Sequence, residues 1–196
     1  MSSTLAPFGL RVAAHQSCLV RPKCYRNAIP SGYATTLYKG APIALNTSGQ
    51  IVIAANGADW LGMFIGVEFR DASGRPNVMN YWPANQTLLA NSEMSVYVVD
   101  DPETIYEIQC EGSVAQAAIF DQANFSVAGG RAVGDGSTMT GLSSCAVSAT
   151  LAGAGVQGML RVIDKALYSD NDWGDSYTTI LAKVARHQGV SAKVAV

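Results

Sequence analysis

The regular spacing of turn-forming residues is the feature that most constrains what this sequence can fold into. From residue 41 onward, short apolar segments are separated by clusters of Gly, Asn, Asp, Ser and Pro, at a spacing of roughly ten residues. Residues 43–45 and 51–54, for example, flank the turn cluster Asn46-Thr47-Ser48-Gly49, which is typical of a β-hairpin. This rhythm predicts a mainly β fold, a barrel- or sandwich-like domain of short antiparallel strands.

The rest of the domain continues the same pattern. In residues 104–109 (TIYEIQ), Ile105 and Glu107 share one face and Tyr106 and Ile108 the other, a mixture that predicts an edge or interface strand. The other predicted strands cover residues 62–69, 77–82, 95–99, 144–149, 157–163 and 177–184.

Helical signals are weak, so the fold should contain at most one or two short helices. Residues 113–125 are Ala-rich, and Val114 and Ala117 share a helical face with Ala118. Asp121 interrupts that face. The Gly-rich stretch that follows, residues 129–141, lacks the Gly-Lys-Ser/Thr of a phosphate-binding loop and is predicted to be an ordinary loop.

The N-terminal segment, residues 1–40, differs from the rest of the chain. Pro7, Pro22 and Pro30 interrupt any regular element, and the apolar residues follow no single period. We therefore predict an extended N-terminal arm over residues 1–40 and a β-rich domain over residues 41–196. The arm would gain order by lying on its own domain or on a neighbour, and deletion of residues 1–30 is expected to leave the domain folded.

Composition favours an assembly component. Charged residues make up only 14% of the 196 residues, against roughly 25% in average soluble domains, while hydrophobic residues make up 48%. Neutral polar residues must cover such a surface, or partners must bury it. The net charge of −2 gives no reason to expect nucleic-acid binding. No apolar run is long enough to span a membrane, and no secretory signal is recognised, so synthesis in a cytosol-like compartment is expected.

The sequence offers few candidate catalytic residues. The chain has two histidines, His15 in the predicted arm and His187 after the last predicted strand, and no serine has the glycine spacing of a nucleophile elbow. Asp100 and Asp101 are adjacent, so on a strand they would point to opposite faces and could not flank a substrate. The sequence predicts a non-enzymatic protein with no catalytic residues and no cofactor.

Metal and disulfide sites are weakly signalled. Asp170, Asp172 and Asp175 resemble the start of a calcium loop, but the EF-hand pattern fails, so no metal site is predicted and only an irregular calcium site stays open. The four cysteines form no Cys-x-x-Cys pair and are predicted to be free, mostly buried thiols, with a bridge between the first two left open. They are Cys18, Cys24, Cys110 and Cys145.

Several short motifs resemble those of small virion structural proteins of tailed bacteriophages. The family is that of capsid cement or decoration proteins, which are encoded near the major capsid protein. The motifs lie at residues 6–11 (APFGLR), 31–35 (SGYAT), 39–43 (KGAPI), 62–67 (GMFIGV), 80–83 (NYWP), 100–102 (DDP) and 106–109 (YEIQ).

The resemblance implies a role in the virion rather than an active site. A protein of this kind binds the outside of the major capsid protein lattice, stabilises the expanded head, and forms a homo-oligomer, commonly a dimer or trimer. It would be made in the host cytoplasm and end on the capsid surface. On this hypothesis the arm supplies the protein interface, first through Phe8, Leu10 and Arg11 and then through Tyr33.

A second interpretation remains open. The chain could be another virion component, such as a tail protein or a carbohydrate-binding or receptor-binding module. It would then use Trp60, Tyr81 and Trp82 as a stacking platform. Aromatic residues at strand ends are more often part of the core or of a protein interface, so we place those two roles ahead of a ligand platform.

Overall fold

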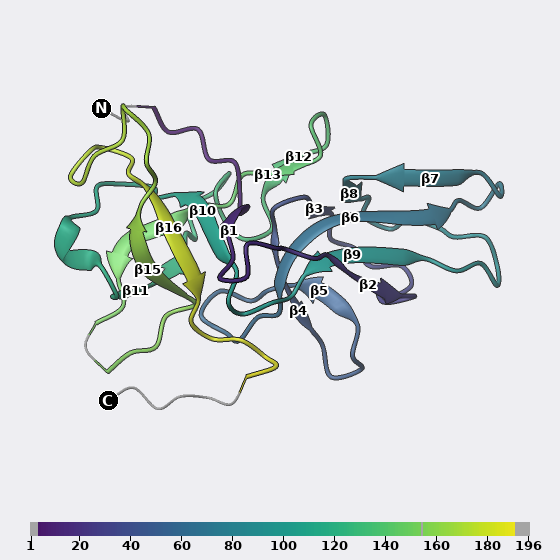
Figure 1. Ribbon diagram of the computed structural model, residues 1–196. Helices are drawn as coiled ribbons and strands as arrows, with labels where there is room; N and C mark the ends of the chain where they lie inside the picture. Colours follow the sequence, from purple (N-terminus) through teal and green to yellow (C-terminus); the bar gives the residue numbers. More distant parts are fainter. Residues whose placement is uncertain (1–3, 154, 191–196) are drawn as a thin grey trace.

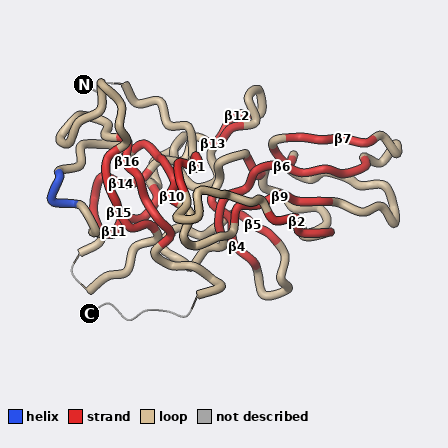
Figure 2. Tube along the Cα trace, viewed as in Figure 1, coloured by secondary structure: helices blue, strands red, loops and turns tan. Residues whose placement is uncertain are grey.

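The fold is mainly β. The computed structural model describes residues 4–153 and 155–190 and consists of several antiparallel sheets in a sandwich-like arrangement, which confirms the predicted fold class (Figure 1). Among these residues the only helical segment is one turn of 3-10 helix, η1 (Gln116–Ala118), and strands and loops make up the remainder (Figure 2).

One six-stranded sheet occupies the left half of the molecule as viewed in Figure 1. Its strand order is β1-β10-β16-β15-β11-β14, and every neighbouring pair is antiparallel. The strands are β1 (Arg11–Ala14), β10 (Ile105–Gln109), β16 (Thr179–Val184), β15 (Leu160–Lys165), β11 (Gln122–Phe125) and β14 (Val147–Leu151).

A second six-stranded sheet forms the other half, where the hairpin of β6 and β7 projects to the far end (Figure 1). Its order is β2-β9-β6-β4-β5, with β7 also paired to β6. The strands are β2 (Lys23–Arg26), β9 (Ser95–Val99), β6 (Gly62–Arg70), β4 (Pro42–Leu45), β5 (Ile51–Ile53) and β7 (Pro76–Met79). Two short pairs complete the fold: β3 (Leu37–Tyr38) with β8 (Tyr81–Trp82), and β12 (Gly136–Ser137) with β13 (Leu142–Ser143).

The hairpin predicted from the turn cluster at residues 46–49 is confirmed as β4–β5. The Asn46 side-chain oxygen accepts the backbone N–H groups of Ser48 and Gln50, both at 2.9 Å, which closes the turn. Gly49 adopts a φ of +72°, a conformation that residues with a Cβ avoid. Local turn chemistry therefore sets the register of these two strands.

Buried side chains from both sheets meet at the junction between them. Trp60, from the loop before β6, is fully buried in the core of the first sheet. Its indole Nε1 donates to the carbonyl oxygen of Met159 at 3.0 Å, and its ring meets that of Phe125 edge-on, with centroids 5.5 Å apart. A second group of buried residues, which includes Phe64 and Trp82, forms the core of the other sheet. The core of the first sheet thus includes Trp60, which comes from the part of the chain that builds the second sheet.

Two local predictions need correction. The helix suggested for residues 113–125 is reduced to the single turn η1, and residues 122–125 form β11 instead. Ala123 and Phe125, two residues apart on a strand paired with β14 and β15, are both buried in the core, as the alternation of side chains along a strand allows. Strand β10 is not an edge strand, since β1 covers its outer side.

The described part of the predicted arm, residues 4–40, lies on the protein's own sheets. It supplies β1 to one sheet, β2 to the other, and β3 to a short pair. Close packing requires glycine at two points: a Cβ on Gly9 would lie 2.9 Å from the Gly40 carbonyl oxygen, and one on Gly40 would lie 2.9 Å from the Leu10 carbonyl oxygen. The sequence left open whether the segment lies on its own domain or on a neighbour. Residues 4–40 lie on their own domain.

The four cysteines are free, as predicted, but only half of them are buried. Cys18 and Cys24 are exposed, whereas Cys110 and Cys145 are fully buried. Burial raises the pKa of each buried thiol to about 12. The reactive thiolate is therefore scarce at these two positions near neutral pH.

This difference predicts selective thiol chemistry. We expect N-ethylmaleimide at pH 8 to modify the folded protein at Cys18 and Cys24 alone, and to reach Cys110 and Cys145 after addition of denaturant, as read by intact mass and peptide mapping. Modification of Cys110 or Cys145 in the folded protein at a rate similar to that of Cys18 would contradict the packing described above.

Candidate functional site

Two predicted interface residues come together where β1 crosses β10. Arg11 lies opposite Glu107 in the strand register, with its Nη1 atom 3.9 Å from a carboxylate oxygen of Glu107. The Arg11 guanidinium also lies over the Phe8 ring, 4.3 Å from the ring centroid. Glu107 is only 7% exposed, so a cation beside its carboxylate offsets part of the cost of burying the charge.

A tyrosine from a distant loop completes this group. The Tyr168 hydroxyl donates to the other carboxylate oxygen of Glu107 at 2.5 Å, and this hydrogen bond raises the pKa of Tyr168. The loop is held by the buried Asn171, whose amide donates to the carbonyls of Ala166 and Thr179. We call Phe8, Arg11, Glu107 and Tyr168 the arm patch.

The other two predicted interface residues lie elsewhere. Leu10 is 3% exposed and packs in the core of the first sheet. Tyr33 packs against the core of the second sheet, and its hydroxyl accepts the backbone N–H of Ile53 at 2.8 Å. The structure therefore brings together Phe8 and Arg11 but not Leu10 or Tyr33.

The arm patch has the composition of a protein-binding surface. Arginine and aromatic side chains are enriched among residues that dominate binding energy. Here Glu107 contacts Arg11 and Tyr168, and Phe8 lies against the Arg11 guanidinium. Next to Tyr168 in the same loop, Leu167 is 88% exposed. An arginine on β1, the Phe8 ring just before it, and the Tyr168 ring and exposed Leu167 on an anchored loop are suited to contact with another protein, because little side-chain freedom is lost on binding.

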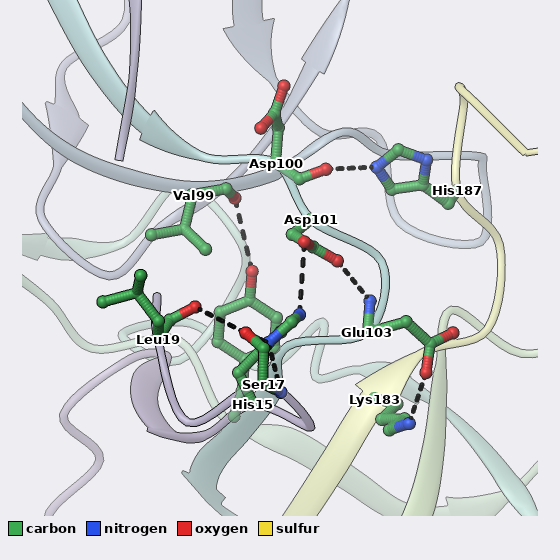
Figure 3. Close-up of polar contacts among 10 residues, drawn as sticks. His15, Ser17, Leu19, Val99, Asp100, Asp101, Glu103, Lys183 and His187 are labelled. Atoms are coloured by element: carbon green, nitrogen blue, oxygen red, sulfur yellow. Dashed lines mark hydrogen bonds and ion pairs between the residues drawn. The ribbon is translucent and has the colours of Figure 1, made fainter. Parts of the chain in front are cut away.

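A second polar cluster surrounds the turn after β9 (Figure 3). It gathers both histidines of the chain, although they lie far apart in sequence. His15 Nε2 lies 3.2 Å from a carboxylate oxygen of Asp101, and His187 Nε2 lies 2.9 Å from the backbone oxygen of Asp100. Glu103, in the same turn, accepts a hydrogen bond from Lys183 of β16 at 2.7 Å.

Ser17, His15 and Asp101 have the residue types of a nucleophilic triad. His15 Nδ1 lies 2.7 Å from the Ser17 hydroxyl oxygen and also accepts the Ser17 backbone N–H at 3.1 Å, so these contacts stabilise a turn. The Ser17 hydroxyl in turn lies 3.3 Å from the Leu19 carbonyl oxygen (Figure 3). The imidazole thus closes a local turn between β1 and β2 and ties it to the turn after β9.

Asp100 points away from Asp101, as expected for adjacent residues leaving a strand. Its carboxylate accepts the hydroxyl of Tyr25 at 2.6 Å and the ammonium of Lys23 at 3.1 Å, both from β2. Burial, followed by the hydrogen bond to Asp100, raises the pKa of Tyr25. The two aspartates therefore fasten different parts of the N-terminal segment, one to each side of the turn.

The acidic loop at residues 169–176 is tied down internally. The Asp172 carboxylate pairs with the Lys165 ammonium, and its backbone N–H donates to the Asp175 carboxylate at 2.8 Å. Among the described residues, no group of three or more His, Cys, Asp or Glu side chains has a spacing that could hold a metal ion. Asp170, Asp172 and Asp175 do not form such a group.

The three aromatic residues suggested as a stacking platform do not form one. Trp60 is fully buried in the first core and Trp82 is 1% exposed in the second, so neither ring can stack on an external ligand. Tyr81 is half-buried and stacks on Tyr38, with ring centroids 6.3 Å apart. The core role, ranked first from the sequence, is the one that both tryptophans fill.

Comparison with protein-family models, with curated proteins and with solved structures finds no match to this chain. Within the described ranges, no helix has the length and apolar character needed to cross a membrane. Function must therefore be inferred from the residues and their geometry.

Proposed function

We propose that this chain is a non-enzymatic virion protein of a tailed bacteriophage, a capsid cement or decoration protein that binds the outside of the major capsid protein lattice and stabilises the expanded head. The observation that carries the proposal is the arm patch, in which Phe8 and Arg11 of the N-terminal segment are pre-positioned with Tyr168 around a buried carboxylate. The motif at residues 6–11, which belongs to the resemblance to such proteins, contains two of the four patch residues.

The composition of the chain supports the same role. A protein with 14% charged residues gains little from long-range electrostatic attraction, so shape and apolar contacts must supply most of its affinity. A capsid lattice offers many equivalent sites. If the chain is a dimer or trimer, as we further propose, modest contacts at each arm patch combine into tight binding through avidity.

The burial of Trp60 and Trp82 removes the stacking platform on which the alternative interpretation was built, a tail component or a carbohydrate-binding or receptor-binding module. A virion component of another kind remains the second candidate, and the test of the main proposal separates the two.

Co-sedimentation tests the proposal directly. The purified full chain is mixed with expanded, DNA-free heads of the phage that encodes it, and bound protein is quantified against the major capsid protein. We expect saturable binding at a fixed ratio, and the ratio would identify the symmetry position occupied. An absence of binding at micromolar concentration, with the protein recovered on tails instead, would refute the cement role and favour the second candidate.

A further inference from the structure

A hollow of about 450 Å³ opens between two loops beside β8, away from the arm patch residues. One loop follows β2 and the other precedes β9. Among the described residues, no charged side chain lines it, and its polar lining consists of small amide and hydroxyl groups. These groups belong mainly to Asn27, Ser31, Asn85, Thr87, Asn91 and Ser92.

The walls of the hollow are pre-formed. The backbone N–H of Asn27 donates to the Met94 carbonyl at 2.8 Å, and the Asn27 side-chain oxygen accepts the Met94 N–H at 2.8 Å. The Asn85 N–H donates to the carbonyl of Tyr33 at 2.8 Å, which ties the second loop to the first. A ligand entering this hollow would meet fixed groups, so little ordering is needed on binding.

The asparagines of the hollow are held in an unusual backbone conformation. Asn27, Asn85 and Asn91 have φ values of +50°, +56° and +59°, and they make up three of the five non-glycine residues with positive φ in the described chain. Asparagine tolerates this left-handed region better than most residues, but the conformation still carries strain. Asparagine in this conformation is common in tight turns, and here the three residues shape the two loops that wall the hollow.

One donor at the hollow lacks a partner. Trp82, which lines it, is 1% exposed, and its indole Nε1 has no hydrogen-bond acceptor in the described structure. Buried donors are almost always satisfied in folded proteins, and an ordered water is the partner that could reach this N–H without exposing the ring. The remaining apolar lining, including Ile29 and Leu88, provides a non-polar surface beside it.

We infer that the hollow binds a neutral saccharide, a mono- or disaccharide or the end of a longer glycan. Amide and hydroxyl side chains both donate and accept hydrogen bonds, as sugar hydroxyls do, whereas a phosphate or carboxylate ligand would require a cation that the lining lacks. The volume lies within the range of small-molecule sites. This inference is independent of capsid binding.

Saturation-transfer NMR with the full chain tests the inference. The probes are D-glucose, D-galactose, D-mannose, N-acetyl-D-glucosamine and their common disaccharides, each at millimolar concentration, with D-glucuronate as the charged comparison. We expect at least one neutral sugar to bind, and Thr87→Val and Ser31→Ala each to weaken that binding about tenfold through loss of one hydrogen bond. Both side chains are exposed, so neither change should affect folding.

Thr150→Val serves as the matched control, since Thr150 is an exposed threonine on β14 of the other sheet. It should leave sugar binding unchanged. The inference fails if no probe binds the wild-type chain, if the hollow variants bind as tightly as the control, or if glucuronate binds as tightly as the best neutral sugar.

Discussion

A chain that lacks residues 1–30 is expected not to fold. The deletion removes β1 and β2, which leaves the backbone of β10 and β9 unpaired on one side, and it removes the buried Leu10 from the first core. Exposed strand edges of this kind promote aggregation. Circular dichroism and size-exclusion chromatography of the truncated chain should show an unfolded or aggregated protein. A soluble monomer with a cooperative thermal transition near that of the full chain would contradict this expectation.

A single substitution tests one part of that effect, the loss of Leu10 from the first core. Leu10→Ala should lower the free energy of unfolding by about 2–5 kcal/mol, because it removes a fully packed leucine side chain and leaves a cavity. Leu19→Ala is the matched control in the same segment. Leu19 is 52% exposed, so its substitution should change stability by no more than about 0.5 kcal/mol. Urea unfolding measures both variants, and equal effects would mean that Leu10 is not part of the core.

The expected failure of the deletion shows what the sequence could not reveal. Three prolines and an irregular apolar pattern in residues 1–40 indicate a segment without long regular elements. The prolines and the apolar pattern do not indicate which strands of the domain this segment pairs with. Pairing of Arg11 with Glu107, or of Tyr25 with Val96, joins residues far apart in the sequence and depends on tertiary structure. The role of residues 1–30 must therefore be tested with point substitutions, because deletion of the segment is expected to unfold the protein.

Local signals were sufficient for part of the domain. Strand β9 (Ser95–Val99) has the predicted bounds, and the β4–β5 hairpin follows from an Asn and a Gly that close its turn. The helix prediction failed where composition misled: part of an Ala-rich segment was placed in strand β11 by pairing with β14 and β15. Propensity is a weak guide wherever tertiary pairing can bury the same side chains.

The candidate site was predictable only in part. The mixed faces of residues 104–109 indicated contact with something beyond the core, and Glu107 is where the arm patch forms. No sequence signal links it to Tyr168, which lies 61 residues away in a loop. The meeting of His15 and His187 at one turn was equally hidden, because each histidine is ordinary in its own segment.

The double variant Phe8→Ala/Arg11→Ala is expected to weaken head binding about 100-fold or more. Each side chain is of a type that commonly contributes about 1–2 kcal/mol or more at an interface centre, and avidity multiplies the loss over an oligomer. Some stability should be lost, because Glu107 loses the cation beside its buried carboxylate and Phe8 is half-buried. The fold should be retained, because the Tyr168 hydroxyl still donates to the Glu107 carboxylate and the strand pairing of β1 with β10 is unchanged. Co-sedimentation with expanded heads measures the loss of binding, and thermal unfolding verifies the fold.

The control for this variant removes the same kinds of side chain from other places. Lys23→Ala/Phe120→Ala deletes one exposed cation, which lies over the Tyr25 ring, and one phenylalanine that is 67% exposed, and neither belongs to the arm patch. It should bind heads like the wild type. If the control weakens binding as much as Phe8→Ala/Arg11→Ala does, the contact surface is not the arm patch.

If both variants bind normally while the wild type saturates the heads, the cement role stands but its surface must be sought elsewhere. Among the exposed apolar side chains, Met139 at the β12–β13 turn and Val127 after β11, 96% and 81% exposed, would then be the first to substitute.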